Sequence, residues 1–323
     1  MTEQKQTLNA HVRSGAFGVF LDPANHLVPS QIVLSTFTFV NKPMNVLQVL
    51  QASAEYLRKH TIDNARLNAE HLLAHVLRRT RMELYLEFER ELGETELAPL
   101  RELVRRRGEG EPLQHLLGTV EFCGLTFLCD KRALVPRPET EELVEFLLSV
   151  VRGQRADIRI LDVGTGSGVI ALSLAHKFPD ARIVAVDVSE NALALARENA
   201  ARLGLSQRVE FRQGDLLEDF TEKFDMIVAN LPYIASSDRA TLSREVLRDP
   251  EIAVFAGEEG DEIIRRLIDQ APVHLEPGGL VALEIGMGQA EGFSAFLGEK
   301  KWRDIETKND YQGVIRFLFA RYG

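Results

Sequence analysis

The chain has 323 residues, which is too long for one ordinary core and about right for two domains. Hydrophobic residues make up 45% and charged residues 27% of it, which excludes a disordered or fibrous protein. The net charge is -10, and residues 112–323 hold 24 basic against 34 acidic residues, so this part lacks the bulk positive charge that binding a long nucleic acid usually requires.

The apolar runs and the cysteines bear on where the protein works. No run reaches the roughly 18 to 20 apolar residues that a membrane helix needs, and the start of the chain shows no secretory leader pattern. Cys123 and Cys129 stand apart from any metal-type grouping of Cys and His, so we expect two reduced, partly buried thiols. We therefore expect a cytoplasmic protein that binds neither a membrane nor a metal.

Residues 1–43 and 44–111 differ in their apolar spacing. The first stretch is rich in Ser, Thr, Asn and Gln without a sustained period, so we expect either a poorly ordered extension or an upstream start codon that the mature protein does not use. From residue 44 onward, apolar side chains recur at helical spacing. Asp63 precedes the second helical stretch, where its side chain is expected to cap the helix. The sequence predicts a small helical bundle over 44–111.

Residues 112–140 have the pattern of a connecting segment. Two short strand-like runs broken by Gly124 predict a β-hairpin. Pro136 and Pro138 then force an extended path, and a helix is expected to begin just after them. This hairpin linker is therefore expected to join the bundle to a larger domain over 141–323.

Strand-like and helix-like segments alternate from residue 158 onward. The expected strands are Ile158–Val163, Arg182–Val188, Val209–Arg212, Phe224–Ala229, Leu280–Ile285 and Val314–Phe319. Such alternation predicts an α/β domain with a mostly parallel, doubly wound sheet covered by helices on both faces. A ligand site is then expected beyond the carboxyl ends of the strands.

A glycine-rich loop follows the first expected strand. Asp162 precedes it, and the loop consists of Gly164, Thr165, Gly166, Ser167 and Gly168. The glycines allow a tight turn and a close approach of the backbone to a ligand at the amino end of the next helix. A dinucleotide-binding loop would need glycine where Val169 stands. The spacing instead resembles the first motif of the Rossmann-like methyltransferases, whose loop passes close to the methionine part of S-adenosylmethionine.

Carboxylates follow the next two expected strands. Asp187 can accept hydrogen bonds from both ribose hydroxyls, a role that it could equally play for NAD. Asp215 could take the exocyclic amine of adenine, with Leu216 packing on the ring. Either carboxylate alone could be an ordinary loop end or helix cap, whereas their order along the chain favours a nucleoside site.

Asn230, Leu231, Pro232 and Tyr233 follow the fourth expected strand. The tetrapeptide resembles the Asn-Pro-Pro-Tyr signature of enzymes that methylate nitrogen on planar groups, although it could also be a plain turn. An amide nitrogen is a poor nucleophile, and no side chain near neutral pH is basic enough to deprotonate it. The Asn230 side-chain oxygen and the Leu231 carbonyl could instead accept its two hydrogens and aim its lone pair at the methyl group. Tyr233 would offer an aromatic face to the planar group.

These motifs leave adenine N6, guanine N2 and a protein glutamine open as methyl acceptors. A more specific resemblance comes from three stretches outside them: Gly110 to His115, Val120 to Gly124 and Val135 to Glu141. They resemble the release-factor glutamine methyltransferases, the HemK/PrmC family. The resemblance runs from about Met44 to the end of the chain.

The resemblance implies methyl transfer from S-adenosylmethionine to N5 of the glutamine in the Gly-Gly-Gln motif of class 1 peptide chain release factors. It implies that Asn230, Leu231, Pro232 and Tyr233 are the catalytic and substrate-binding residues, and that the cofactor is held by Asp162, Gly164, Thr165, Gly166, Ser167, Gly168, Asp187, Asp215, Leu216 and Asn230. It further implies that the helical bundle recognises the release factor, and we expect a monomer. The chain departs from the family at Leu231, where proline is usual; the carbonyl survives, but Leu leaves φ freer.

Two other functions compete with this hypothesis. A nucleic-acid base methyltransferase would present a flipped adenine or guanine to the same tetrapeptide, but it would normally carry a basic target-recognition surface. A non-catalytic, dinucleotide-binding protein would hold NAD in place of S-adenosylmethionine. Val169 and the tetrapeptide after the fourth strand both argue against it.

Overall fold

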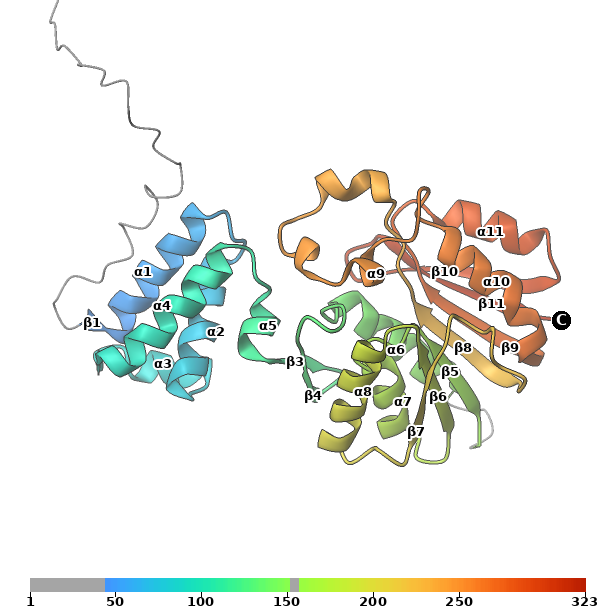
Figure 1. Ribbon diagram of the computed structural model, residues 1–323, viewed down its shortest axis with the longest axis horizontal. Coiled ribbons are helices and arrows are strands. Elements are labelled where there is room, and N and C mark those ends of the chain that lie inside the picture. Colours follow the sequence, from blue (N-terminus) through green and yellow to red (C-terminus); the bar gives the residue numbers. More distant parts are fainter. Residues whose placement is uncertain (1–43, 152–156) are drawn as a thin grey trace, which may run out of the picture. The chain divides into compact units, whose positions relative to one another are not determined.

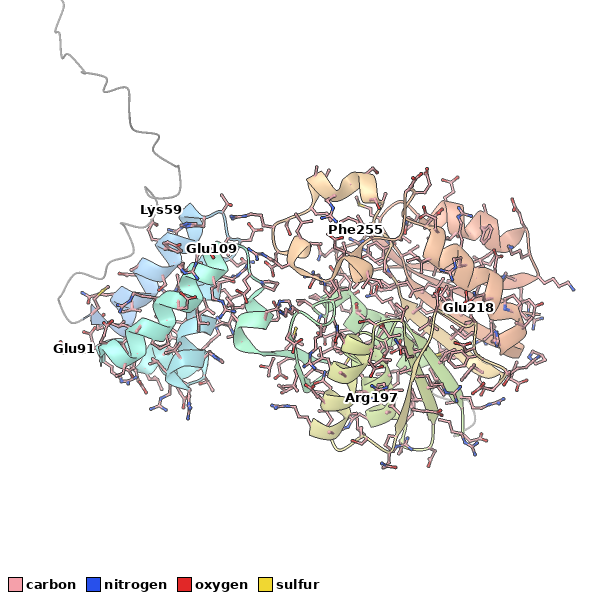
Figure 2. The ribbon with its side chains drawn as sticks, viewed as in Figure 1. Lys59, Glu91, Glu109, Arg197, Glu218 and Phe255 are labelled. Carbon is pink, nitrogen blue, oxygen red and sulfur yellow. The ribbon has the colours of Figure 1, made fainter. Side chains whose placement is uncertain are left out.

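Figure 1 shows a computed structural model, in which helices dominate the first part of the chain and strands alternate with helices through much of the rest. The structure describes residues 44–151 and 157–323, so the predicted extension over 1–43 lies outside the described residues. Exposed side chains of both charges, among them Lys59, Glu91 and Glu218, extend from the surface in Figure 2.

The helical pattern predicted over 44–111 is confirmed. The elements are β1 (Met44–Asn45), α1 (Val46–Lys59), α2 (Ala65–Leu77), α3 (Arg81–Leu86), β2 (Glu91–Leu92) and α4 (Glu94–Gly108). Fully buried aliphatic side chains such as Leu57, Leu73 and Leu100 form their core. The prediction that Asp63 caps α2 is wrong. The residue before α2 is Asn64, which has φ 50° and makes no side-chain cap hydrogen bond, because the chain enters the helix through a left-handed turn.

The predicted hairpin is present and is preceded by a short helix, α5 (Leu113–Leu117). Its strands are β3 (Thr119–Phe122) and β4 (Leu125–Leu128), which pair antiparallel. The two turn residues, Cys123 and Gly124, have φ of 49° and 77°, as a tight two-residue hairpin requires. The next helix, α6 (Pro138–Val151), begins at a proline, whose missing N–H would be unpaired in the first turn anyway. Cys123 and Cys129 are free thiols; the first is partly buried and the second is buried.

A seven-stranded sheet, in the order β10-β11-β9-β8-β5-β6-β7, forms the centre of the larger domain. The strands are β5 (Arg159–Val163), β6 (Arg182–Asp187), β7 (Val209–Gln213), β8 (Phe224–Asn230), β9 (Leu275–Glu284), β10 (Trp302–Asn309) and β11 (Ile315–Tyr322). β11 is antiparallel to both its neighbours, and the neighbouring pairs from β9 to β7 are parallel. The mostly parallel sheet is confirmed. β10 was not predicted, because most of its side chains are charged or polar.

Helices cover both faces of this sheet (Figure 1). Besides α6 they are α7 (Val169–Lys177), α8 (Glu190–Arg202), α10 (Glu262–His274) and α11 (Ala290–Gly298). Successive residues of a strand point to opposite faces. On β5, for example, Ile160 packs with the cluster that contains α6 and α7, and Leu161 packs with the cluster that contains α10 and α11.

The order of the strands fixes where a ligand can bind. The chain runs from β5 outward to β6 and β7, and then returns to β8 on the other side of β5. The loops that leave β5 and β8 therefore diverge, which opens a crevice at their carboxyl ends.

The segment between β8 and α10 was not assigned from the sequence. It forms the short elements η2 (Ser236–Thr241), η3 (Val246–Arg248) and α9 (Glu251–Val254). An isolated β-bridge between Ile234 and Phe255 brings the end of this segment back beside the residues that follow β8. We call residues 234–255 the bridging segment.

Candidate active site

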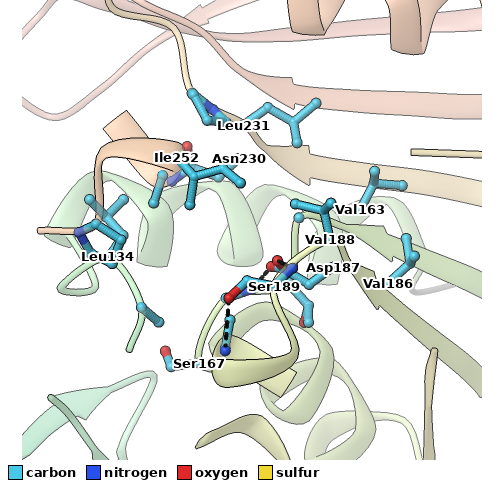
Figure 3. Close-up of a pocket in the computed structure, with 18 of the residues that line it drawn as sticks. Leu134, Val163, Ser167, Val186, Asp187, Val188, Ser189, Asn230, Leu231 and Ile252 are labelled. Carbon is cyan, nitrogen blue, oxygen red and sulfur yellow. Dashed lines mark hydrogen bonds between the residues drawn. The ribbon is translucent and has the colours of Figure 1, made fainter. Parts of the chain in front are cut away.

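A pocket opens beyond the carboxyl ends of β5, β6, β7 and β8. The predicted residues that line it are Gly164, Thr165, Gly166, Ser167, Asp187, Asp215, Leu216, Asn230, Leu231 and Pro232. Asp162, Gly168 and Tyr233 do not line it. In Figure 3, Asp187 and Ser189 approach the cavity from one side, and Asn230 and Leu231 approach it from another. The structure thus brings most of the predicted residues, from separate loops, into one cavity.

The glycine loop is built from left-handed backbone. Gly164, Gly166 and Gly168 have φ of 72°, 56° and 83°, which other residues rarely adopt. Space adds a second constraint at Gly164, since a Cβ there would lie 2.6 Å from the Leu231 Cδ2 atom. At Gly166 the nearest neighbour of a Cβ would be Ala133, at 3.9 Å, so the loop is open to the pocket at this residue.

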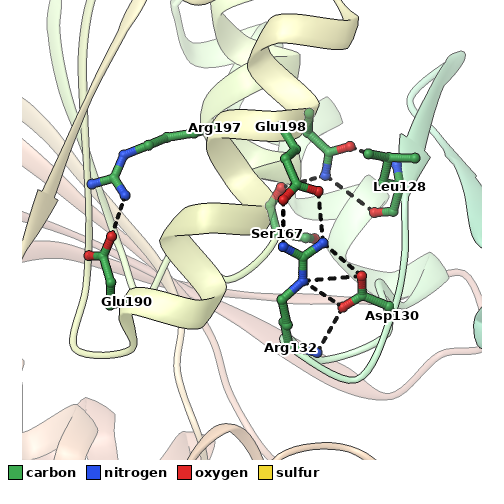
Figure 4. A network of polar contacts seen from close by, with 8 residues as sticks. Leu128, Asp130, Arg132, Ser167, Glu190, Arg197 and Glu198 are labelled. Atoms are coloured by element: carbon green, nitrogen blue, oxygen red, sulfur yellow. Dashed lines mark hydrogen bonds and ion pairs between the residues drawn. The ribbon is translucent and has the colours of Figure 1, made fainter.

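Asn199 on α8 holds this loop from behind, and sequence analysis missed it. Its buried side chain donates from Nδ2 to the Ser167 carbonyl at 3.0 Å and to the Leu128 carbonyl at 3.2 Å, and its Oδ1 accepts the Leu128 N–H at 2.6 Å (Figure 4). One amide therefore joins the glycine loop to the hairpin. A buried Asn on the apolar face of a helix was the available signal.

Asp162 acts behind the loop and not in the pocket. Its fully buried carboxylate accepts the Thr165 hydroxyl at 2.7 Å and the Ala171 N–H at 3.1 Å, both on Oδ2. Its Oδ1 is buried without a hydrogen-bond partner. Burial raises the pKa of Asp162 to about 7. The residue ties the first turn of α7 to the end of β5.

Asp187 lies at the end of β6 and faces the pocket. Its Oδ2 accepts the Gly166 N–H and its Oδ1 accepts the Ser189 N–H, both at 2.8 Å (Figure 3). These two bonds fix the plane of the carboxylate, and each oxygen retains a lone pair for a further donor. Burial raises the pKa of Asp187, although both bonds oppose the shift. The geometry suits a ligand with two adjacent hydroxyls.

Asp215 and Leu216 differ from each other in burial. The half-exposed Asp215 carboxylate forms an ion pair with Arg266 of α10, at 2.8 Å. Leu216 is buried at φ 52°, an uncommon conformation for a residue with a branched side chain. Leu216 therefore gives the pocket an aliphatic surface, and the charge of Asp215 is already balanced by Arg266.

The turn after β8 is braced from several sides. Asn230 donates from Nδ2 to the Thr140 hydroxyl at 2.9 Å. Gln289 donates to the Tyr233 carbonyl at 3.1 Å, which fixes the other end of the turn. Burial raises the pKa of Tyr233 to about 12, so its phenol stays protonated near neutral pH. Sequence analysis missed Thr140 and Gln289, which are distant along the chain.

The bridging segment supplies another wall of the pocket that the sequence did not predict. Pro250 and Ile252 line the cavity. Next to them, the buried Asp249 accepts the Val135 N–H at 3.1 Å and pairs with Arg137 at 2.7 Å. Burial raises the pKa of Asp249 to about 6, and Arg137 opposes that shift. An Asp-Pro pair in a polar stretch was the available signal.

The lining fits a nucleoside that carries a polar aliphatic arm. Asp187 presents an oriented carboxylate for hydroxyl groups, and Leu134 and Ile252 supply apolar surface for a ring. The open side of Gly166 lets the backbone approach the arm closely. Among the described residues there is no grouping of three or more His, Cys, Asp or Glu side chains that could hold a metal ion.

Comparisons with known proteins agree with this geometry. A family model described as PrmC N-terminal domain matches residues 48–118, and one described as methyltransferase domain matches residues 154–282. The release factor glutamine methyltransferase of Geobacter sulfurreducens is 39% identical over 280 residues, which cover 86% of this chain and 97% of that protein. The protein of the same name from Deinococcus radiodurans is 40% identical over 278 residues, which cover 86% and 99%.

Among solved structures, the hMettl16 catalytic domain in complex with the MAT2A 3'UTR hairpin 6 has the same fold, with a TM-score of 0.50. It is 18% identical, and the match covers 68% of this chain and 81% of that chain.

The sheet, the pocket and the methyltransferase match define a Rossmann-like, class I methyltransferase that uses S-adenosylmethionine as its methyl donor. The NAD-binding alternative is therefore wrong. The chain belongs to the family of release factor glutamine methyltransferases, since relatives of that name match it over almost their whole length. The resemblance inferred from the sequence is confirmed, and the nucleic-acid alternative is not favoured.

Proposed function

We propose that this enzyme transfers a methyl group from S-adenosylmethionine to N5 of the glutamine in the Gly-Gly-Gln motif of class 1 release factors. One observation carries the proposal: Gly166 and Asp187 line the same pocket as Asn230 and Leu231. The cofactor side and the acceptor side are thus adjacent. The names of the relatives indicate release factors as the protein substrate.

In the proposed mechanism the chain positions the amide and supplies no strong base. Bound S-adenosylmethionine supplies an electrophilic methyl group. Asn230 Oδ1 and the Leu231 carbonyl accept the two hydrogens of the glutamine nitrogen, which turns its lone pair out of conjugation. Tyr233 packs against the planar amide. The nitrogen becomes acidic once it is alkylated, so its proton is lost to solvent after the methyl group has transferred.

We propose the following roles on the cofactor side. The loop from Gly164 to Gly168 approaches the methionine arm, Asp187 binds the ribose hydroxyls, and Asp215 and Leu216 border the adenine. Asp162 supports the loop through Thr165. Leu231, in place of the usual proline, keeps the required carbonyl and is held by its packing on Gly164.

We propose that the helical residues 44–111 recognise the release factor, with 112–140 as a linker to the catalytic residues 141–323 and with 1–43 as an extension. The enzyme is proposed to act as a monomer in the cytoplasm, where release factors work, and nucleic acid is not proposed as its substrate. No helix among the described residues is long and apolar enough to span a membrane.

Mass spectrometry of a full-length release factor tests the proposal. After incubation with enzyme and S-adenosylmethionine, the peptide that contains Gly-Gly-Gln should gain one methyl group on its glutamine. In parallel reactions with S-adenosylmethionine that carries a labelled methyl group, DNA and rRNA should gain no label. Label in nucleic acid with none in the release factor would contradict the proposal.

A further inference from the structure

Glu284 is a buried carboxylate beside Asn230 that the mechanism above does not use. It ends β9, and in the parallel pairing of β8 with β9 it is the direct neighbour of Asn230. The Thr140 hydroxyl, from the first turn of α6, lies between the two side chains. Thr140 and Glu284 are only 3% and 2% exposed, so water does not compete for their hydrogen bonds.

The hydrogen bonds of these three residues run in one direction. The Thr140 hydroxyl donates to Glu284 Oε2 at 2.7 Å and accepts from Asn230 Nδ2 at 2.9 Å. An ionised carboxylate can only accept, and a hydroxyl has a single hydrogen to donate. The hydrogen of Thr140 is therefore committed to Glu284, so that Asn230 must face Thr140 with its NH2 group.

The consequence appears at the other end of the Asn230 amide. Among the described residues no hydrogen bond reaches Asn230 Oδ1, and Asn230 lines the pocket. With Nδ2 held by Thr140, the oxygen is the end available to a ligand. A side-chain amide can exchange its oxygen and nitrogen by a half-turn at little steric cost, so its direction has to be set by its partners.

We propose that Thr140 and Glu284 are positioning residues that set the polarity of Asn230, so that an acceptor and not a donor faces the methylated amide. The inference rests on the proposed function. Ionised Glu284 takes the hydrogen of the Thr140 hydroxyl, and Thr140 then accepts from the NH2 group of Asn230. The oxygen of Asn230 is thereby left to face the substrate. A reversed Asn230 would oppose its NH2 group to the NH2 group of the glutamine, and the hydrogen bond that aims the lone pair would be lost.

Protonation of Glu284 removes this constraint. A neutral carboxyl can donate to Thr140, whose hydrogen is then free for Asn230 Oδ1, and the whole chain of bonds can reverse. Burial raises the pKa of Glu284 to about 7, and nearby Glu139 adds to the shift, whereas the side-chain hydrogen bond with Thr140, the charge of Arg316 and a direct side-chain interaction with Asn230 oppose it. Tyr233, which faces Glu284 from the turn after β8, stays protonated in this range. Methyl transfer should therefore decline as the pH falls through about 7.

Three variants separate polarity from packing, each assayed with full-length release factor. Thr140→Val removes the hydroxyl but keeps the shape, and it should lower kcat by about 10- to 100-fold, the range for a displaced reacting group, with KM for release factor little changed. Thr140→Ser restores the hydroxyl and should recover most of that kcat. Glu284→Gln should lower kcat and abolish the decline of kcat between about pH 8 and about pH 6. Calorimetry with S-adenosylhomocysteine checks that each variant is folded.

The outcomes distinguish this inference from the function on which it rests. A wild-type enzyme that leaves the release factor unmodified overturns both. A wild-type enzyme that methylates it, together with a folded Thr140→Val variant of undiminished kcat, overturns only the polarity inference. A Thr140→Ser variant as slow as Thr140→Val also overturns it, because the lost group would then be the methyl and not the hydroxyl. If kcat of Glu284→Gln still declines between about pH 8 and about pH 6, Glu284 does not set the direction of the Asn230 side chain.

Discussion

The two ends of the pocket are assembled over very different distances along the chain. At the donor end, which we define as residues 162–189, the side-chain hydrogen bonds join residues 2 to 21 positions apart, from Ser189 to Asp187 at the short extreme to Gly166 and Asp187 at the long one. At the acceptor end, Asn230 reaches Thr140 over 90 positions and Thr140 reaches Glu284 over 144. The donor end is a local motif, whereas the acceptor end exists only once the sheet and α6 have packed together.

The largest expected effect comes from removing Asn230, the residue of the acceptor end that is proposed to hold the glutamine amide. Asn230→Ala deletes the acceptor oxygen that is proposed to aim the glutamine nitrogen, and it leaves the glycine loop and Asp187 intact. We expect the barrier to methyl transfer to rise by about 2 to 4 kcal/mol, the range for losing one preorganised polar contact. Steady-state kinetics with a full-length release factor measures this as a fall in kcat.

Two controls belong with this variant. Its affinity for S-adenosylhomocysteine, measured by calorimetry, should stay close to that of the wild type. Ser236→Ala, at an exposed position of η2 in the bridging segment, should leave kcat unchanged. If Asn230→Ala turned over as fast as the wild type, Asn230 would have no part in the mechanism, and the residues we call the acceptor end would not hold the methyl acceptor.

A second variant tests how the acceptor side is held together over long distances. Arg137→Ala leaves the buried Asp249 carboxylate with the Val135 N–H but without its charge partner. We expect the free energy of unfolding to fall by about 1 to 3 kcal/mol, because a buried charge loses its compensation. Chemical denaturation measures it.

Arg197→Ala is the matched control for this loss, since the ion pair between Arg197 and Glu190 is exposed on α8 (Figure 4). Arg197→Ala should lower the free energy of unfolding by less than about 1 kcal/mol. Equal losses for Arg137→Ala and Arg197→Ala would mean that the contact at Asp249 does not stabilise the wall of the pocket.

The same difference in distance explains what the sequence could predict. The loop from Gly164 to Gly168, and Asp187 after it, follow strands whose apolar runs are short and clear, so their place at one edge of the sheet was predictable. Asn230 was predictable for the same reason. Thr140 was recognised only as part of a motif, and its bond to Asn230 could not be found, because no local pattern records which helix packs over which strand end.

The elements that were missed share a physical cause. β10 lies at the edge of the sheet, and its polar side chains give no apolar period. The bridging segment forms short helical turns that take their conformation from contacts such as the Asp249–Arg137 pair. The turn before α2 places Asn64, not Asp63, at the helix start, because its left-handed backbone favours Asn. Each depends on tertiary contacts or turn geometry more than on apolar spacing.

Within the donor end, the buried Asp162 predicts a dependence of stability on pH. Burial raises its pKa from 3.8 to about 7, so the folded chain binds a proton more readily than the unfolded chain does. Stability is then highest below the unfolded pKa and falls as the pH rises through about 4 to 7. Asp162→Asn removes this contribution, so its melting temperature should fall less than that of the wild type between about pH 5 and about pH 7.5.

Glu284 and Asp249, whose pKa values burial also raises, remain in the Asp162→Asn variant and leave part of the slope in place. The informative quantity is therefore the difference between the two slopes, followed by thermal denaturation without ligand. Parallel slopes would mean that Asp162 is ionised in the folded protein already near pH 5.

The smallest expected effect is at Asp215, which lies outside the donor end, where the pocket meets the surface. Its carboxylate is half exposed and already paired with Arg266, so water and an existing partner compete with any ligand. Asp215→Asn keeps an acceptor oxygen, and we expect calorimetry to show affinity for S-adenosylhomocysteine weakened by less than about 1 kcal/mol. A loss of tenfold or more would mean that the bound adenine seals Asp215 from water. In that case the rim of the pocket at Asp215 would depend on the ligand for its structure, as the acceptor end depends on the packing of α6 against the sheet.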